Sequence, residues 1–226
     1  MPELKKTAPP PTDHSKLKEK QRRLRDTFPA NIGLRLHRAI SWLGRAESET
    51  EDADLRFILL WIGFNAAYAG ELRDEAFGER GAFKSYFEAL VALDADDRIF
   101  NSVWQRFSQE IRLLLNNRYV FAPFWSHQNG IDGYGDWEVR LADSQRSIAK
   151  AMQQHDTAKL LSTVFDRLYV LRNQLVHGGA TWNSSVNRDQ VRDGAAVLGW
   201  LLPVFIDIMM DNSGRDWGKP FYPVVD

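Results

Sequence analysis

Cysteine is absent from the 226 residues of this chain. A disulfide framework, a thiolate metal site and a cysteine nucleophile are therefore all excluded. The absence fits a reducing compartment, and the first 25 residues lack the apolar core of a secretory signal, so we expect a cytoplasmic protein. No stretch reaches the ~18 uncharged apolar residues of a membrane span, and we expect no membrane partner.

Other signatures are missing as well. No segment shows the apolar–polar alternation of a β-strand, and there is no internal repeat and no Gly-rich phosphate loop. The histidines show no H-x3-H spacing, and Glu47, Glu49 and Glu51 alternate in an expected loop, so we expect neither a metal nor a cofactor. Apolar residues still make up 44% of the chain, which is enough for a sizeable core.

Charge is distributed unevenly along the chain. The formal net charge is −1, yet the first 25 residues hold eight Lys or Arg against three acidic residues, a net of +5 that leaves −6 for the remainder. Such a basic run is either a solvated tail or an arm that touches phosphates. We expect residues 1–27 to form a basic tail, disordered or partly helical, and residues 213–226 to form a C-terminal tail.

Apolar residues recur at helical spacing over most of the chain between these tails. The pattern predicts an all-α, single-domain helical bundle of six to seven helices over residues 28–212. The expected helices cover residues 31–48, 52–72, 80–93, 96–117, 137–154, 156–177 and 187–210. Residues 119–137 are rich in glycine and aromatics and show no period, so we expect an ordered loop there. Its aromatic side chains, such as Trp125 and Tyr134, either stack on a base or anchor the loop.

The stretch "RNQLVHGG" closes the helix expected over residues 156–177. On a helical wheel Asp166, Asn173 and His177 fall on one polar face, and Arg172 lies beside the opposite, apolar stripe. That stripe consists of Leu161, Val164, Phe165, Leu168, Leu171 and Leu175. The glycines at 178–179 are a strong stop signal, and they place the imidazole at the negative end of the helix dipole.

Two interpretations of this stretch remain open at the sequence level. A histidine in the last turn can simply cap the helix, and Arg172 can pair with an acidic neighbour. Alternatively, the imidazole of His177 moves a proton beside a phosphate that the arginine holds in a bidentate fork.

The same residues resemble a known family. Arg172-Asn173-x-x-x-His177 is similar to the R-x4–6-H signature of HEPN domains, including the Asn directly after the Arg. It stands at the end of a long helix in an all-α chain, where that family carries it. With "RFILLWIGFNAAY" upstream, the chain resembles the Apea-like and uncharacterised bacterial branches, and the helical organisation extends the likeness over residues 30–210. Asp166 matches an acidic position of some catalytic members.

The resemblance implies a metal-independent endoribonuclease in which two protomers pair and form one composite cleft. Arg172 would stabilise the phosphoryl transition state, and His177 would act as general acid/base on the 2′-OH or the leaving 5′-oxygen of the RNA. Asn173 would orient His177 or contact the phosphate, and Asp166 would position Arg172 or His177. Many members are toxins with an antitoxin partner or phage-defence effectors, whereas others are inactive RNA-binding or scaffold modules.

The segment after the motif offers further candidates. Thr181, Asn183 and Arg188 are possible phosphate contacts for RNA, while Ser184, Ser185 or Asn187 would cap the last helix, which is the more ordinary role. Three hypotheses follow from the sequence: a homodimeric ribonuclease, a catalytically inactive RNA-binding or scaffold module, and a sensor that uses the aromatic loop as a ligand pocket.

Overall fold

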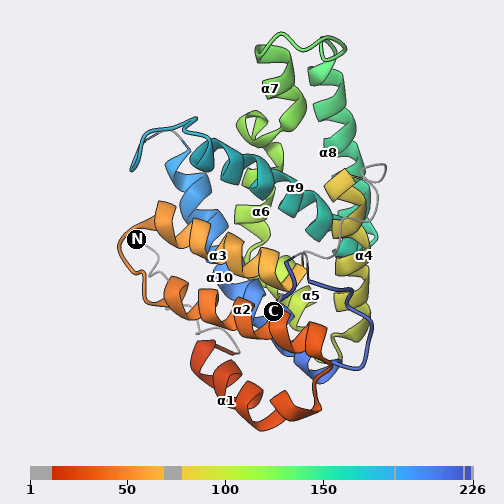
Figure 1. Cartoon of the computed structure of the whole chain (residues 1–226). Coiled ribbons are helices and arrows are strands. Elements are labelled where there is room, and N and C mark those ends of the chain that lie inside the picture. Colours follow the sequence, from red (N-terminus) through yellow and green to blue (C-terminus); the bar gives the residue numbers. More distant parts are fainter. Residues whose placement is uncertain (1–11, 69–77, 186, 221, 225–226) are drawn as a thin grey trace, which may run out of the picture.

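The protein is all-helical, as the sequence predicts (Figure 1). The computed structural model describes residues 12–68, 78–185, 187–220 and 222–224, and this part contains no β-strand. Its α-helices are α1 (His14–Leu24), α2 (Ala30–Glu47), α3 (Ala53–Tyr68), α4 (Gly78–Leu93), α5 (Arg98–Asn101), α6 (Ser108–Asn116), α7 (Ala122–Gln128), α8 (Trp137–Gln153), α9 (Thr157–Val176) and α10 (Arg188–Asp211). Short turns of 3-10 or π-helix are η1 (Arg25–Thr27), η2 (Ser102–Arg106) and η3 (Arg118–Val120).

The helix count exceeds the expected six or seven for three reasons. Residues 14–24 and 122–128 form α1 and α7, and the single helix expected over residues 96–117 divides into α5 and α6 around a π-helical turn. In that turn the Phe107 backbone N–H donates to the Ser102 carbonyl at 3.0 Å, a bond five residues long. The other expected helices are present with ends within a few residues of the prediction.

Helix α10 is the centre of the bundle. It packs against α2 and α3 and also contacts α1, α4, α5 and α9. Its length and composition would allow it to cross a membrane, but 72% of its most apolar window is buried inside the fold, as in a core helix. Proline at 203 does not end the helix, which continues to Asp211.

Aromatic rings join α3, α4, α9 and α10 in the interior. Phe165 of α9 lies 4.5 Å from Phe64 of α3 and 4.7 Å from Phe87 of α4, measured between ring centroids. Phe205 of α10 completes the group at 5.8 Å from Phe87. Buried rings at such separations contribute beyond their buried area. They fix α9, the helix that carries the Arg172–His177 motif, against the core.

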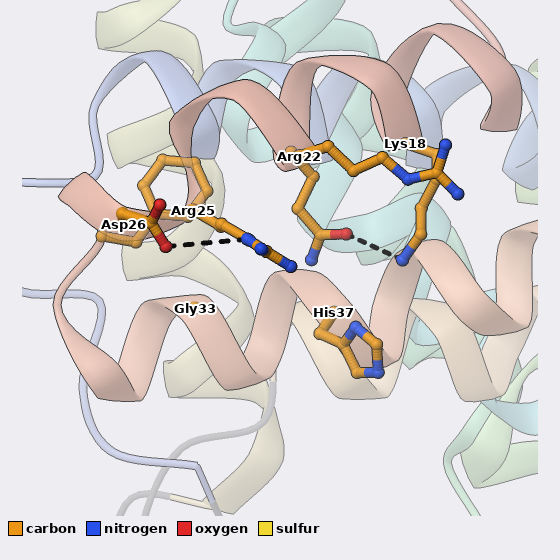
Figure 2. A pocket seen from close by; sticks show the side chains of 8 residues that line it. Lys18, Arg22, Arg25, Asp26, Gly33 and His37 are labelled. Carbon is orange, nitrogen blue, oxygen red and sulfur yellow. Dashed lines mark hydrogen bonds and ion pairs between the residues drawn. The ribbon is translucent and has the colours of Figure 1, made fainter.

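Helix α1 is part of the folded bundle, which corrects the expected domain start near Phe28. Leu17 is fully buried against α2, and Gln21 is also buried. Beside this contact α1 and α2 border a pocket (Figure 2). A charged run with only two regularly spaced buried residues gives a weak periodic signal, so the sequence left open whether this run is disordered or partly helical. Residues 1–11 of the expected tail lie outside the described residues.

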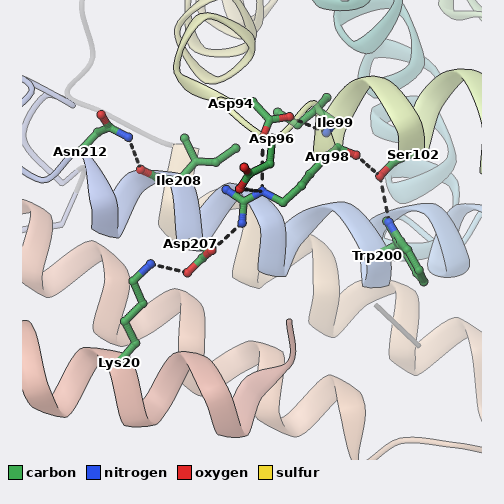
Figure 3. Close-up of polar contacts among 10 residues, drawn as sticks. All are labelled: Lys20, Asp94, Asp96, Arg98, Ile99, Ser102, Trp200, Asp207, Ile208 and Asn212. Atoms are coloured by element: carbon green, nitrogen blue, oxygen red, sulfur yellow. Dashed lines mark hydrogen bonds and ion pairs between the residues drawn. The ribbon is translucent and has the colours of Figure 1, made fainter. Parts of the chain in front are cut away.

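A network of charged side chains ties α1 and α5 to α10 (Figure 3). Asp207 of α10 accepts from Lys20 Nζ through Oδ1 and from Arg98 Nη1 through Oδ2, both at 2.6 Å. Arg98 also bonds Asp94 at 3.3 Å, and Lys20 reaches Asp211 at 2.6 Å. Burial of Asp207 opposes its ionisation, but the bonds from Lys20 and Arg98 outweigh that effect and lower the pKa of Asp207.

The C-terminal residues also pack on the bundle. The buried Arg35 guanidinium of α2 donates from Nη2 to the Lys219 carbonyl at 2.8 Å, and Arg38 Nη1 donates to the Tyr222 carbonyl at 2.6 Å. Trp217 packs on the core and donates from Nε1 to the Asn212 carbonyl at 2.9 Å. The segment expected as a C-terminal tail is therefore docked on α2 over its described residues.

The expected loop at residues 119–137 is largely helical, so that prediction was wrong in part. The segment begins in η3, continues into α7 and leaves only residues 129–136 as the connection to α8. Pro123 stands in the first turn of α7, where its missing N–H removes no helical hydrogen bond. Phe124 is buried and packs edge-on against Trp137 at 5.0 Å. A seven-residue helix is too short to show a period.

Replacing the central carboxylate tests the charged network. We expect Asp207→Asn to lower the free energy of unfolding at pH 7 by about 2 kcal/mol, because two charged donors lose their shared acceptor. Because folding lowers the pKa of Asp207, its ionised carboxylate stabilises the fold fully above the ordinary pKa of 3.8. This stabilisation is lost as pH falls through the pKa of the folded state. Urea denaturation from pH 7 to pH 3 should therefore show the two proteins converging below about pH 4.

Asp211→Asn is the matched control for this measurement. Asp211 bonds the same Lys20, but its side chain is 52% exposed against 15% for Asp207. The cost should stay below about 1 kcal/mol, as for other exposed pairs. Equal losses in the two variants would contradict the central role assigned to Asp207.

Candidate functional site

Helix α9 ends in a hydrogen-bonded cap that fixes the motif histidine. His177 is the C-cap residue, and its backbone N–H donates to the Asn173 carbonyl at 2.9 Å. Gly178 adopts a left-handed φ of 71°, and its N–H bonds the Leu175 carbonyl while the N–H of Gly179 bonds that of Gln174. These are the two bonds of a Schellman motif. The helix stop predicted from the two glycines is confirmed, and the imidazole stands exposed at the end of α9.

The motif arginine is turned toward its neighbouring amide. Arg172 Nη1 donates to Asn173 Oδ1 at 2.9 Å, and both residues are half-buried. Helical geometry separates Arg172 from His177 by about 140° around the axis, but Asn173 from His177 by only about 40°. The hydrogen bond therefore draws the guanidinium toward the face that carries Asn173 and His177.

Asp166 lies farther back along α9. Eleven residues separate it from His177, which is roughly 16 Å along the helix axis and beyond the reach of a direct hydrogen bond. Six residues separate it from Arg172, or roughly 9 Å along the axis. Asp166 is half-buried on the same polar face as Asn173. Of the two partners expected for Asp166, only Arg172 is within range inside one chain.

Gln174 joins three segments beside the motif, a role that the sequence did not reveal. Its Nε2 donates to the Tyr119 carbonyl at 2.6 Å, and its Oε1 accepts from Asn187 Nδ2 at 2.9 Å. Trp125 Nε1 donates to the same Tyr119 carbonyl at 2.7 Å. The aromatic segment of η3 and α7 is thereby held against the end of α9. Its aromatic content was visible in the sequence, but its place beside the motif was not.

A charged contact anchors the segment that follows the motif. Asp54 of α3 accepts through Oδ2 from the Asn183 backbone N–H at 2.8 Å and from Arg188 Nη2 at 2.9 Å. Arg188 also donates from Nε to the Ser184 carbonyl at 3.1 Å. Two of the three residues expected to touch RNA, Asn183 and Arg188, thus take part in this anchor. The third, Thr181, is exposed.

A second contact anchors the indole of the same segment. Trp182, which is 75% exposed, donates from Nε1 to Asp52 Oδ2 at 2.7 Å. The pKa of Asp52 is lowered, chiefly by the Leu55 backbone N–H at the start of α3 and further by the bond from Trp182. The indole face is thus presented to solvent while its N–H is held.

Exposed aromatic side chains therefore lie in the segments next to the end of α9. Tyr119 is 42% exposed and Trp125 is 36% exposed, and the Arg118 guanidinium lies 5.0 Å above the Tyr119 ring. Flat rings and a guanidinium offer stacking surfaces for bases. Tyr134, the other proposed stacking residue, instead lies under the Arg140 guanidinium at 5.0 Å. The described residues contain no group of three or more His, Asp or Glu arranged to hold a metal ion.

Replacing the capping glycine tests how strongly the motif depends on its helix end. Gly178→Ala forces a side chain into the left-handed region, and we expect the free energy of unfolding to fall by about 1 kcal/mol. Gly135→Ala is the control, since its φ is not left-handed and a Cβ there would meet no atom within 4 Å. Denaturation curves of the two variants should differ; an unchanged midpoint for Gly178→Ala would argue against a glycine-dependent cap.

Comparison with known proteins leaves the family open. No protein-family model, curated protein or solved structure matches this chain. The likeness to HEPN domains rests on the motif from Arg172 to His177 and on the all-helical organisation of the chain.

Proposed function

We propose that this protein is a metal-independent endoribonuclease of the HEPN type that acts as a homodimer. The observation that carries the proposal is the hydrogen bond from Arg172 to Asn173. It turns a guanidinium toward the face of α9 where the His177 imidazole stands exposed in a fixed cap. One group binds a phosphate and the other transfers a proton, and these are the two roles that phosphodiester cleavage requires.

The homodimer follows from the position of these groups on one helix. About 140° of rotation separates Arg172 from His177 around α9, so the two side chains leave the helix in different directions, and the bond to Asn173 turns the guanidinium only part of the way toward the imidazole. A two-fold axis beside the helix end would place Arg172 of one chain opposite the same helix end of the partner subunit, where its imidazole stands. The composite cleft that the family resemblance implies is therefore also the arrangement that brings a guanidinium and an imidazole to one phosphate.

The chemistry in that cleft is an in-line transesterification. The ribose 2′-oxygen attacks the adjacent phosphorus, its proton passes to a base, and the bond from phosphorus to the 5′-oxygen breaks. The products are a 2′,3′-cyclic phosphate and a 5′-hydroxyl. His177 takes the 2′-proton or protonates the leaving 5′-oxygen, while Arg172 neutralises charge on the equatorial oxygens. Asn173 acts as a positioning residue that aims the guanidinium.

The surroundings of the motif support an RNA strand as the substrate. Tyr119, Trp125 and Trp182 are exposed in the segments next to the helix end, and stacking of bases needs exposed aromatic rings. A toxin or phage-defence effector is the setting that the resemblance suggests. An antitoxin or defence-system protein would be the corresponding partner.

A catalytically inactive RNA-binding or scaffold module is the second candidate. It is favoured by Arg188, which was expected to contact RNA but instead forms an ion pair with Asp54. It is also favoured by Asp166, which lies too far along α9 to orient His177 in the same chain. Such a module would bind RNA without cleaving it.

Removing the imidazole separates the two candidates. We expect the purified protein to cleave single-stranded RNA in the presence of EDTA, and His177→Ala to lower the rate by at least ~100-fold through loss of proton transfer. His127→Ala, another exposed histidine in a last helical turn, is the control and should cleave at the wild-type rate. Full activity in His177→Ala would disprove the assignment. RNA binding without cleavage by the wild type would establish the second candidate.

Mixing two inactive variants tests the composite cleft. Arg172→Ala and His177→Ala homodimers should each be inactive, whereas a refolded equal mixture contains heterodimers with one intact pair. We expect the mixture to regain about a quarter of the wild-type cleavage rate, because half of the dimers carry one of two working pairs. A mixture that stays inactive, although native mass spectrometry shows the heterodimer, would place both groups in the same chain.

A further inference from the structure

The pocket between α1 and α2 is lined by positively charged side chains that have no role in the proposed nuclease site. It encloses about 330 Å³ and is lined from α1 and η1 by Lys18, Arg22 and Arg25. Asp26 is the one carboxylate in the lining, against three permanent cations and the His37 imidazole of α2. Figure 2 shows Lys18 and Arg25 reaching from the upper helix into the gap toward His37.

None of these three cations forms a strong ion pair with another described residue. Lys18 Nζ donates to the neutral Gln21 at 3.0 Å, and Arg25 meets Asp26 at 3.6 Å with both side chains more than two-thirds exposed, a weak pair. Arg22 has no hydrogen bond or ion pair with any described residue. Lys20 of the same helix contrasts with them, because it lies between Asp207 and Asp211. The pocket therefore presents positive charge that an anion can neutralise.

The pocket is larger than a phosphate and has an apolar wall. Its volume lies at the lower end of the range for small-molecule sites, roughly 300–1,000 Å³. Phe28 is half-buried in the lining, and Gly33 leaves space beside it, where a Cβ would stand 3.7 Å from Phe28 Cβ. An aromatic ring next to several cations suits a base joined to a phosphate.

We infer that this pocket binds a nucleoside phosphate, with Lys18 and Arg22 on the phosphate and Phe28 against the base. The ligand is either a free mononucleotide or one nucleotide of a single RNA strand. The pocket is separate from the Arg172–His177 motif: Figure 1 shows α1 at the bottom of the molecule and the segment after α9 at the upper left, with α2 and α3 between them. The inference therefore goes beyond the proposed nuclease and does not depend on it.

Calorimetric titration of the full chain with adenosine 5′-monophosphate tests the site. We expect saturable binding that Lys18→Gln and Arg22→Gln each weaken at least ~10-fold, because each removes a charge-assisted contact to phosphate. Arg23→Gln is the matched control: it removes the same charge from the next residue of α1, which does not line the pocket, and should change affinity less than ~2-fold. Adenosine without phosphate should bind at least ~10-fold more weakly.

Two further titrations identify the source of the nucleotide. A short oligoribonucleotide that displaces the mononucleotide, with the same loss in Arg22→Gln, shows that the site takes a nucleotide of an RNA strand. Displacement by mononucleotides alone shows a free ligand. His177→Ala should bind as the wild type does, so a failed nuclease assay leaves this test intact. Absence of binding by all probes, or equal losses in Arg22→Gln and Arg23→Gln, would overturn the inference.

Discussion

The fold depends on burying one long apolar helix together with the half-buried carboxylate of Asp207. Helix α10 is covered by α2 and α3 and contacted by α1, α4, α5 and α9. Asp207 lies on it, and an uncompensated charge there would cost several kcal/mol. Lys20 and Arg98 supply the compensation, which fixes where α1 and α5 dock. Hydrophobic burial is non-directional, whereas these ion pairs have geometry, so the charged network selects one arrangement among those that would cover α10.

The same core also determines the position of the exposed C-terminal end of α9. The rings around Phe165 hold the body of α9 rigidly, and the Schellman cap ends it at Gly178. Gln174 then joins the end of the helix to η3 and to Asn187, and Asp54 holds the segment that follows. A motif of one guanidinium and one imidazole is thereby placed on a rigid support. Such support is what general acid/base catalysis needs, since misplacement by 1 Å can cost 10²-fold.

The cationic pocket of α1 and α2 and the candidate nuclease site lie at different ends of the molecule (Figure 1). The motif surroundings are aromatic, and the arginine nearest to the following segment, Arg188, is paired with Asp54. Weakly paired cations line the pocket of α1 and α2. Under the two proposals, such a division would let one face recognise a phosphate while another performs chemistry. It would also reconcile a net charge of −6 outside the first 25 residues with the proposed binding of nucleotides.

The sequence alone determined the all-helical class, six of the seven expected helices and the stop at Gly178, because 3.6-residue periodicity and glycine chemistry are local properties. It also identified Arg172, Asn173 and His177 as neighbours on one helix end. It did not show that Leu17 packs α1 into the core or that Arg188 forms an ion pair with Asp54. It also did not show that residues around Pro123 and Phe124 form a helix where a loop was expected. Those facts depend on partners 13 to 134 residues away, and short or charged helices acquire their stability from such contacts rather than from their own periodicity. Only the tertiary structure decided them.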